Sequence, residues 1–243
     1  MKMIKLTITI LVLLCFVYSN LNAQKTEGII YYKSKINSKK LDEYLTNKRK
    51  SIKNKNVIES LDKVFLYTKS INSTISFSKG EALFVVENKL DVDINDLGQR
   101  VLKTVSGGER EYYFNDKNKT YLIKDCEALG ECFIFDNTYL EWQLTQETKT
   151  INGYKSYKAT RSNGKVIAWY TPSIPLGFGP KGEYGLPGLI LELEIGNVIF
   201  NASKIVLNPK EVIKIEEPKG GKRVSKEEYE VIMDKAKKSV FGN

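Results

Sequence analysis

Glu192 and Glu194 are the most chemically suggestive pair of side chains in the sequence. They alternate with the apolar residues Leu191, Leu193 and Ile195, so both carboxylates would project from one face of a β-strand. Such a pair could serve as the acid and base of a hydrolase, or it could hold a cation. The same alternation is ordinary where one face of a sheet meets solvent, and we favour that interpretation.

Cys126 and Cys132 form a second pair, with five residues between them in the string DCEALGEC. In an oxidising compartment two cysteines this close usually form a disulfide, which would stabilise the fold by about 2 kcal/mol. Two thiolates could also hold Cu(I), and free thiols are the third alternative. Because the spacing is not C-x-x-C and the sequence contains no histidine, we predict a disulfide and no metal.

The absence of histidine excludes several catalytic classes. Ser-His-Asp and Cys-His triads require it, as do imidazole-based zinc and haem sites. Ser-Lys dipeptides at 78–79 and 225–226 could be read as nucleophile and base, but such dipeptides arise by chance in a lysine-rich chain. The glycine pairs at 107–108 and 220–221 lack the spacing of a phosphate-binding loop. We therefore expect no catalytic residue and no cofactor.

The first 23 residues have the features of a secretory leader. Lys2 and Lys5 supply a positive start, residues 6–18 are almost wholly apolar, and Ala23 is a small residue suited to cleavage. The apolar stretch is too short for a good membrane anchor. We predict a signal peptide at 1–23, a single β-rich domain at 24–243 without a transmembrane anchor, and a periplasmic or secreted location.

The predicted mature chain is basic. Removal of two leader lysines leaves 36 basic residues against 29 acidic ones, a net charge of +7. Scattered lysines could attract anionic lipid head groups or an acidic partner, but we favour the interpretation that they form a solvated surface. The charge is accompanied by no nucleic-acid-binding motif, so we predict no nucleic acid as a partner.

The distribution of apolar residues predicts a mainly β (α+β) protein. We expect an antiparallel meander or half-barrel sheet, with one or two N-terminal helices and a C-terminal helix. Asn163-Gly164 and Gly196-Asn197 are typical of tight hairpin turns, and Ser225 is a natural helix N-cap. The expected strands are 28–36, 64–77 and 83–86, with hairpins at 111–124, 154–170 and 189–207; the expected helices are 41–63 and 225–240, and 88–100 is expected to be a loop or edge.

The segment 172–188 is the main candidate for a functional surface. It holds four of the six prolines and five of the seventeen glycines, which together specify a loop of defined shape. This loop could be a rigid apolar lip or docking surface, or it could fold back and plug the sheet. Trp142 and Trp169 could stack on a ligand or pack in the core. The residues assigned provisionally to ligand or partner binding are Ile174, Leu176, Phe178, Tyr184, Leu186 and Trp169.

An ordered series of short motifs runs through residues 142–195 and ends in the hexapeptide Gly185-Leu186-Pro187-Gly188-Leu189-Ile190. The others are LEWQL around Trp142, then ETK at 147–149, INGY at 151–154, YKAT at 157–160, AWYT at 168–171, IP at 174–175 and GP at 179–180. The series resembles the GLPGLI family of exported proteins, seen mostly in Bacteroidota. Members often carry a cysteine where Ser156 and Tyr157 stand, so a role for that cysteine is not carried over.

The resemblance implies an envelope protein, and family genes commonly accompany those of outer-membrane TonB-dependent receptors. It implies no established activity. We therefore predict non-catalytic binding of an apolar ligand or peptide segment. The alternative is an accessory protein of a TonB-dependent receptor system, and a carboxylate or Ser/Lys hydrolase is the third hypothesis.

Overall fold

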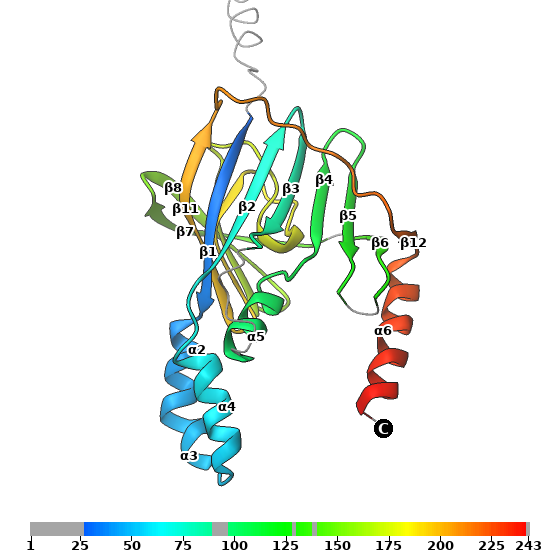
Figure 1. Cartoon of the computed structure of the whole chain (residues 1–243). Coiled ribbons are helices and arrows are strands. Elements are labelled where there is room, and N and C mark those ends of the chain that lie inside the picture. The colour runs from blue at the N-terminus through cyan, green and yellow to red at the C-terminus, as the bar shows by residue number, and fades with distance from the viewer. Residues whose placement is uncertain (1–26, 89–96, 128–129, 138–139, 242–243) are drawn as a thin grey trace, which may run out of the picture.

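A computed structural model describes residues 27–88, 97–127, 130–137 and 140–241 of the chain (Figure 1). The predicted leader at 1–23 lies outside these residues. In the part of the chain that the structure describes, no helix is long and apolar enough to cross a membrane.

Twelve strands form one open sheet that is antiparallel throughout except for the short pairing of β12 with β6. Two meanders, β1 to β6 and β7 to β11, join where β1 pairs with β11. This confirms the predicted mainly β fold. The strands are β1 (Gly28–Ile36), β2 (Ile71–Ser78), β3 (Glu81–Val86), β4 (Glu111–Asn115), β5 (Thr120–Asp125), β6 (Phe133–Asp136), β7 (Gln143–Ile151), β8 (Tyr154–Arg161), β9 (Val166–Thr171), β10 (Leu189–Ile195), β11 (Val198–Leu207) and β12 (Lys222–Arg223).

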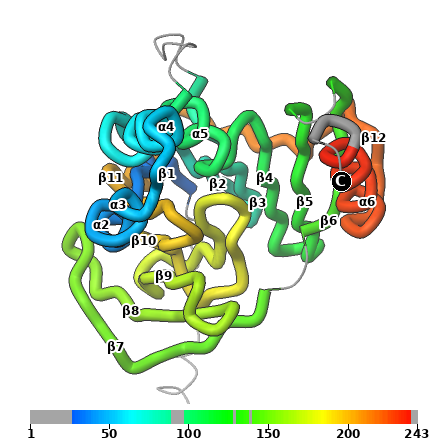
Figure 2. The backbone as a smooth tube through the Cα atoms, turned by 90° about the horizontal axis from the view of Figure 1, so that it is seen from below, coloured from blue at the N-terminus to red at the C-terminus, as the bar shows by residue number. Residues whose placement is uncertain are grey.

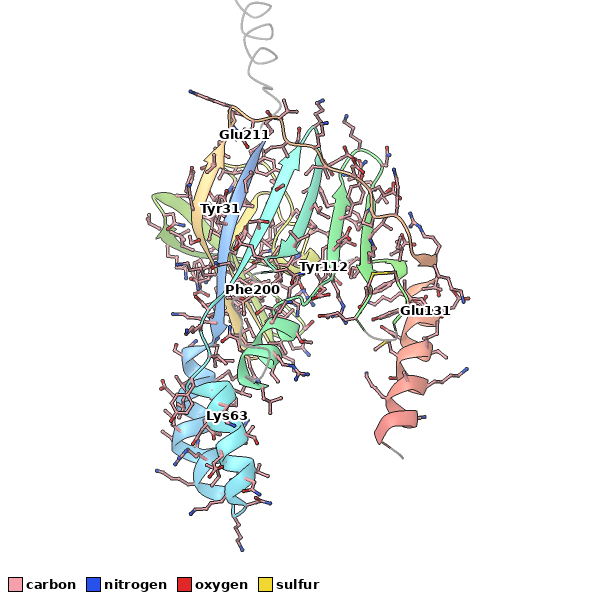
Figure 3. The ribbon with its side chains drawn as sticks, in the orientation of Figure 1. Tyr31, Lys63, Tyr112, Glu131, Phe200 and Glu211 are labelled. Atoms are coloured by element: carbon pink, nitrogen blue, oxygen red, sulfur yellow. A yellow bond between two sulfur atoms is a disulfide. The ribbon has the colours of Figure 1, made fainter. Side chains whose placement is uncertain are left out.

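The core lies on the concave side of the sheet, because alternate residues of each strand point inward. Ile30 and Tyr32 of β1, Ile75 of β2 and Phe84 of β3 are almost fully buried there, and the view in Figure 3 includes Phe200 of β11 among these strands. Figure 2 shows the sheet curving around the yellow segment that connects β9 to β10. The predicted Gly/Pro loop is therefore inside the curve.

A helical hairpin projects from one end of the sheet between β1 and β2 (Figure 1). It consists of α2 (Ser38–Glu43), the π-helical turn η1 (Tyr44–Lys48), α3 (Arg49–Ser51) and α4 (Lys55–Phe65). Tyr44 stacks on Phe65 with ring centroids 4.4 Å apart and donates a 2.7 Å hydrogen bond to Asp62. The hairpin thus has a small core of its own and confirms the predicted N-terminal helices.

The C-terminal helix α6 (Lys226–Phe241) packs against the last strands of the first meander. Tyr229 stacks on Phe135 at 4.1 Å and donates a 2.5 Å hydrogen bond to the buried Asp125. At its start the Ser225 hydroxyl accepts from the amide of Glu228, whose carboxylate accepts from the amide of Ser225. This confirms Ser225 as the predicted N-cap, and the bond accepted by Glu228 completes a capping box.

Two sequence expectations are wrong. Residues 64–70 are not strand, because α4 continues to Phe65, where the side chain completes the stack on Tyr44, and β2 begins only at Ile71. Residues 97–100 of the expected loop belong to the helix α5 (Leu97–Val105). This helix packs on α4 at Gly98, where a Cβ atom would lie 2.2 Å from the carbonyl oxygen of Lys63. The rest of that expected loop, 89–96, lies outside the described residues.

Candidate functional site

The segment 172–188 folds into a small hairpin of its own. Phe178 and Tyr184 form an isolated antiparallel bridge, the amide of Gly179 donates to the carbonyl of Glu183 (2.7 Å), and that of Gly185 donates to Gly177 (3.0 Å). The short turn η2 (Pro180–Gly182) closes the tip. Glycine and proline thus build a loop of defined shape, as their density in the sequence predicted.

The five apolar side chains of this loop that were assigned to binding all point into the core. Their exposed fractions lie between 1% and 7%, for Ile174, Leu176, Phe178, Tyr184 and Leu186. The exposed residues of the segment are instead Pro172, Ser173, Pro175, Gly185 and Pro187. The exposed part of the loop is therefore mainly backbone and proline, and of the five assigned residues Leu176 and Leu186 line the pocket described below.

Trp169 lies apart from these five residues. Its neighbours in β9, Ala168 and Tyr170, are buried in the concave core, so the indole projects from the opposite face of the sheet. The Lys149 ammonium sits 4.3 Å from its ring centroid and 2.7 Å from the Glu192 carboxylate. Trp169 is thus not brought together with the loop.

Four hydrogen-bonding contacts fix the tip of the loop. The Arg161 guanidinium of β8 forms a bidentate ion pair with the buried Glu183, with Nε 2.8 Å from Oε2. The other three are from Trp142 Nε1 to the Tyr184 carbonyl (2.8 Å), from Asn137 Nδ2 to the Gly182 carbonyl (2.8 Å) and from Lys181 Nζ to the Val105 carbonyl (3.0 Å).

The charges around the loop tip are largely buried. Burial, and next the nearby charge of Arg110, hold the pKa of Lys181 below its ordinary value. Its ammonium lies at the C-terminal end of α5, where the helix dipole favours a cation. Because separate elements hold the tip, the loop is a preorganised part of the fold.

An aromatic cluster connects the loop to the β4–β5 hairpin. Tyr121 stacks on Tyr184 with ring centroids 3.8 Å apart, and Phe114 lies 5.0 Å from both Tyr121 and Phe178. Burial raises the pKa of Tyr121 above its ordinary value. Stacked and tilted rings at these distances attract one another beyond the area they bury, so they join the loop to the first meander.

A pocket of about 450 Å³ opens between the loop and the β4–β5 hairpin. We call it the loop pocket, and such a volume is in the range of small-molecule sites. Apolar groups make up most of its wall, and Asp116 and Lys119 form an exposed ion pair at its rim. The lining residues are Gly80, Phe114, Asp116, Lys119, Tyr121, Pro175, Leu176, Gly177, Gly185, Leu186, Pro187 and Gly188.

Two glycines of the hexapeptide are required by the backbone. At Gly188 a Cβ atom would lie 2.1 Å from the carbonyl oxygen of Thr171, so no larger residue fits without movement of the main chain. Gly185 has φ = +93°, a conformation that other residues rarely adopt. Residues 185–188 of the hexapeptide, held in this backbone geometry, form one wall of the loop pocket.

The other candidate groups are separate from this site. Glu192 pairs with Lys149 and Glu194 accepts a 2.8 Å hydrogen bond from Asn37, so the two carboxylates have different partners. Cys126 and Cys132 form the predicted disulfide. Across the described ranges, no group of three or more acidic, cysteine or histidine side chains could hold a metal ion.

Sequence reasoning did not identify four residues of the site. Phe114 and Tyr121 were assigned only to a hairpin, and Arg161 and Glu183 carried no signal of a pair. Tyr121 reaches the loop by its stack on Tyr184 and Arg161 by its pair with Glu183, and a single sequence shows no trace of such tertiary contacts. The only hints of this pair were a charged residue, Arg161, at the end of an expected strand and a charged residue, Glu183, within a loop rich in glycine.

A comparison with known protein families gives one match, over part of the chain. Residues 160–192, which span the last two residues of β8, the whole of β9, the loop and the first part of β10, match a family model described as a protein of unknown function (Porph_ging). No curated protein matches the chain significantly.

Among solved structures, PNGF-II in space group P21 is similar with a TM-score of 0.50 and 16% identity, over 88% of this chain and 34% of that one. The C2 form of PNGF-II gives 0.49 and 16%, over 88% and 33%. The chain thus spans about a third of the length of PNGF-II. At this identity the likeness concerns the fold alone.

Proposed function

We propose that the protein is a non-catalytic binding protein of the GLPGLI family, exported to the periplasm or secreted, which holds an apolar small molecule or peptide segment in the loop pocket. The observation that carries the proposal is the make-up of the wall. Gly185 to Gly188 form one side, Phe114 and Tyr121 contribute aromatic surface, and the volume is about 450 Å³. Concave, mostly apolar sites with a few polar groups are the usual form of a ligand site.

The rigidity of the loop supports binding at this place. Arg161 and Trp142 hold the tip from the second meander, and Asn137 holds it from the end of β6. A wall that is already ordered loses little conformational freedom when a ligand binds, which favours affinity. The Asp116–Lys119 pair at the rim offers one charge of each sign to a polar end of the ligand.

Native mass spectrometry of the protein isolated without detergent from its own envelope tests the proposal. We expect a bound mass on the wild-type chain and on the variant Lys165→Trp, which alters the exposed turn of the β8–β9 hairpin. We expect its loss in Asp116→Trp, where a bulky ring at the exposed rim would fill the loop pocket. A bare mass for all three proteins, or an equal bound mass in both variants, would contradict the proposal.

A second candidate is an accessory role beside an outer-membrane TonB-dependent receptor. The observation in its favour is β7, a nine-residue strand at the end of the sheet with mostly exposed residues. An exposed edge can accept a strand from a partner, although the register shift between Leu144 and Thr148 works against regular pairing. A photo-crosslinker at the exposed Leu144 in intact cells should capture an envelope protein if this role is correct. An identical capture from Val212, an exposed residue outside β7, would count against it.

A further inference from the structure

The helical hairpin α2–α4 and the single helix α6 extend beyond the same end of the sheet, on the side away from the loop pocket. Figure 1 shows the hairpin α2–α4 and the helix α6 both directed downward, and both face the viewer in the view from below in Figure 2. The loop pocket is lined by Gly80 and by Asp116 and Lys119 in the β2–β3 and β4–β5 turns, which lie at the upper end. The molecule thus has two different ends.

The tips of both groups are strongly basic. Residues 48–58 at the tip of the hairpin contain four lysines, one arginine and no acidic residue. Residues 235–238 of α6 contain three lysines and no acidic residue. By contrast, the segment 208–220, which runs along the upper side, carries three lysines and three glutamates. We call 48–58 and 235–238 together the basic end.

Part of this charge is used within the hairpin itself. Arg49 forms a bidentate pair with Asp62, and Lys48 pairs with Glu43 at 3.2 Å. Among the described residues, Lys50, Lys53 and Lys55 have no carboxylate within ion-pair distance. These three ammonium groups are exposed and are available to a partner.

The basic end is held in place by the fold. Asp125 and the rings of Phe133 and Phe135 fix α6 through Tyr229. The hairpin is braced by α5, which approaches α4 closely at Gly98. Two separate basic tips that are fixed relative to one sheet fit a flat, extended anionic surface better than a small anion.

Apolar side chains lie among the lysines of the hairpin tip. Val57 is 44% exposed and Ile52 is half-buried. Side chains of this kind enter the boundary between head groups and acyl chains while neighbouring lysines contact the head groups. Anionic lipids attract such basic segments, each lysine strengthening binding about fivefold.

We propose that the basic end binds the surface of a membrane that contains anionic lipids, with both tips in contact. In this orientation the sheet stands on the membrane and the loop pocket opens toward the aqueous phase. The proposal is independent of what the loop pocket binds.

Vesicle flotation with the full-length mature chain tests the proposal. We expect binding to phosphatidylcholine vesicles containing about 30% phosphatidylglycerol, no binding to phosphatidylcholine alone, and release at about 0.5 M salt, where screening is strong. The triple variant Lys50→Glu, Lys53→Glu and Lys55→Glu should bind about 100-fold more weakly. Lys235→Glu with Lys238→Glu should bind about 25-fold more weakly.

The matched control reverses the same number of charges elsewhere. Lys117, Lys214 and Lys219 are exposed residues outside the basic end, and their change to glutamate should weaken binding no more than about threefold. An equal loss in this control would show attraction by net charge alone and overturn the proposal. An absence of binding to the anionic vesicles would also overturn the proposal. Binding to a soluble polyanion such as heparin, without binding to vesicles, would overturn it as well. Circular dichroism of each variant confirms that the fold is intact.

Discussion

The two ends of the molecule are built from different kinds of residue. At the loop-pocket end, glycine, proline and buried aromatic rings fix a backbone surface, and the partly buried Arg161 pairs there with the buried Glu183. At the basic end, short helices carry exposed lysines around a small core of Tyr44 and Phe65. Shape is therefore specified at the first end and charge at the second. Substitutions should accordingly affect stability at the first end and surface binding at the second.

Removal of the Arg161 side chain should give the largest loss of stability. Arg161→Met leaves the Glu183 carboxylate, 5% exposed, without its cation, and breaking a buried pair in this way costs about 3–5 kcal/mol. Urea unfolding measures the loss. The double variant Arg161→Met, Glu183→Met should recover a large part of it, because no charge remains buried.

Arg49→Met at the other end is the matched control. Arg49 is 45% exposed and pairs with Asp62, so solvent compensates for much of what is lost. We expect a clearly smaller effect than for Arg161→Met. Equal losses for the two arginines would contradict the contrast between the ends.

Gly188→Ala should have the next largest effect. The new methyl group would lie 2.1 Å from the Thr171 carbonyl oxygen, a backbone atom that cannot rotate away. We expect a loss of about 2 kcal/mol in thermal or urea unfolding, in the range found for overpacking. Gly196→Asn is the control, because Gly196 has open space and a φ of +60° that asparagine tolerates. A Gly188→Ala protein as stable as this control would mean that the hexapeptide backbone is not held as described.

The attachment of α6 should depend on pH. Burial alone would raise the pKa of Asp125, but hydrogen bonds from Tyr229, the Glu127 amide and Arg110 outweigh it and hold that pKa below its ordinary value. A lowered pKa in the folded state stabilises the protein above about pH 4, and this contribution is lost as pH falls further. Burial, with the Asp125 hydrogen bond second, raises the pKa of Tyr229 to about 12. Its contribution is present below about pH 10 and is lost as pH rises through 12.

Met233 is the only methionine of the predicted mature chain and packs beside Tyr229 in the α6 cluster. Its methyl resonance should therefore move in acid and again in strong alkali, and the acid step should be absent in Asp125→Asn. A methyl signal that changes only with global unfolding would contradict this account.

Tyr229→Phe should lower the free energy of unfolding by about 1.5 kcal/mol at neutral pH, because it removes a hydrogen bond to a charged group.

The smallest effect on stability should come from the basic end. The triple change of Lys50, Lys53 and Lys55 to glutamate should alter the free energy of unfolding by no more than about 0.5 kcal/mol, as is usual for exposed residues. The same variant should lose most of its binding to anionic vesicles. A large destabilisation would show that these lysines contribute to folding stability, which would contradict the contrast between the two ends of the molecule.

Local signals in the sequence predicted much of the fold. The Asn163-Gly164 and Gly196-Asn197 turns, the Ser225 cap and the close cysteines each act over a few residues, and the structure confirms each of them. The helix α5 was not predicted, because Val101 and Val105 are exposed and its buried positions include Gly98 and Gln99. Leu97, Val101 and Val105 do recur at helical spacing, but they are exposed while Leu102 is buried, so this period does not mark the buried face.

The site was predicted only in its loop. The density of glycine and proline identified 172–188 correctly as an ordered segment, but not which atoms would face outward. That depends on contacts of Tyr184 with Tyr121 and of Glu183 with Arg161, across 63 and 22 residues of sequence respectively. These contacts bury the apolar side chains of the loop, which the density of glycine and proline alone does not predict.

A crystal structure of the protein isolated without detergent from its own envelope tests the central claim most directly. The account predicts non-protein electron density in the loop pocket, in contact with Phe114, Tyr121 and the backbone of 185–188. Density for a bound molecule at any other place, with the loop pocket holding only water, would contradict it.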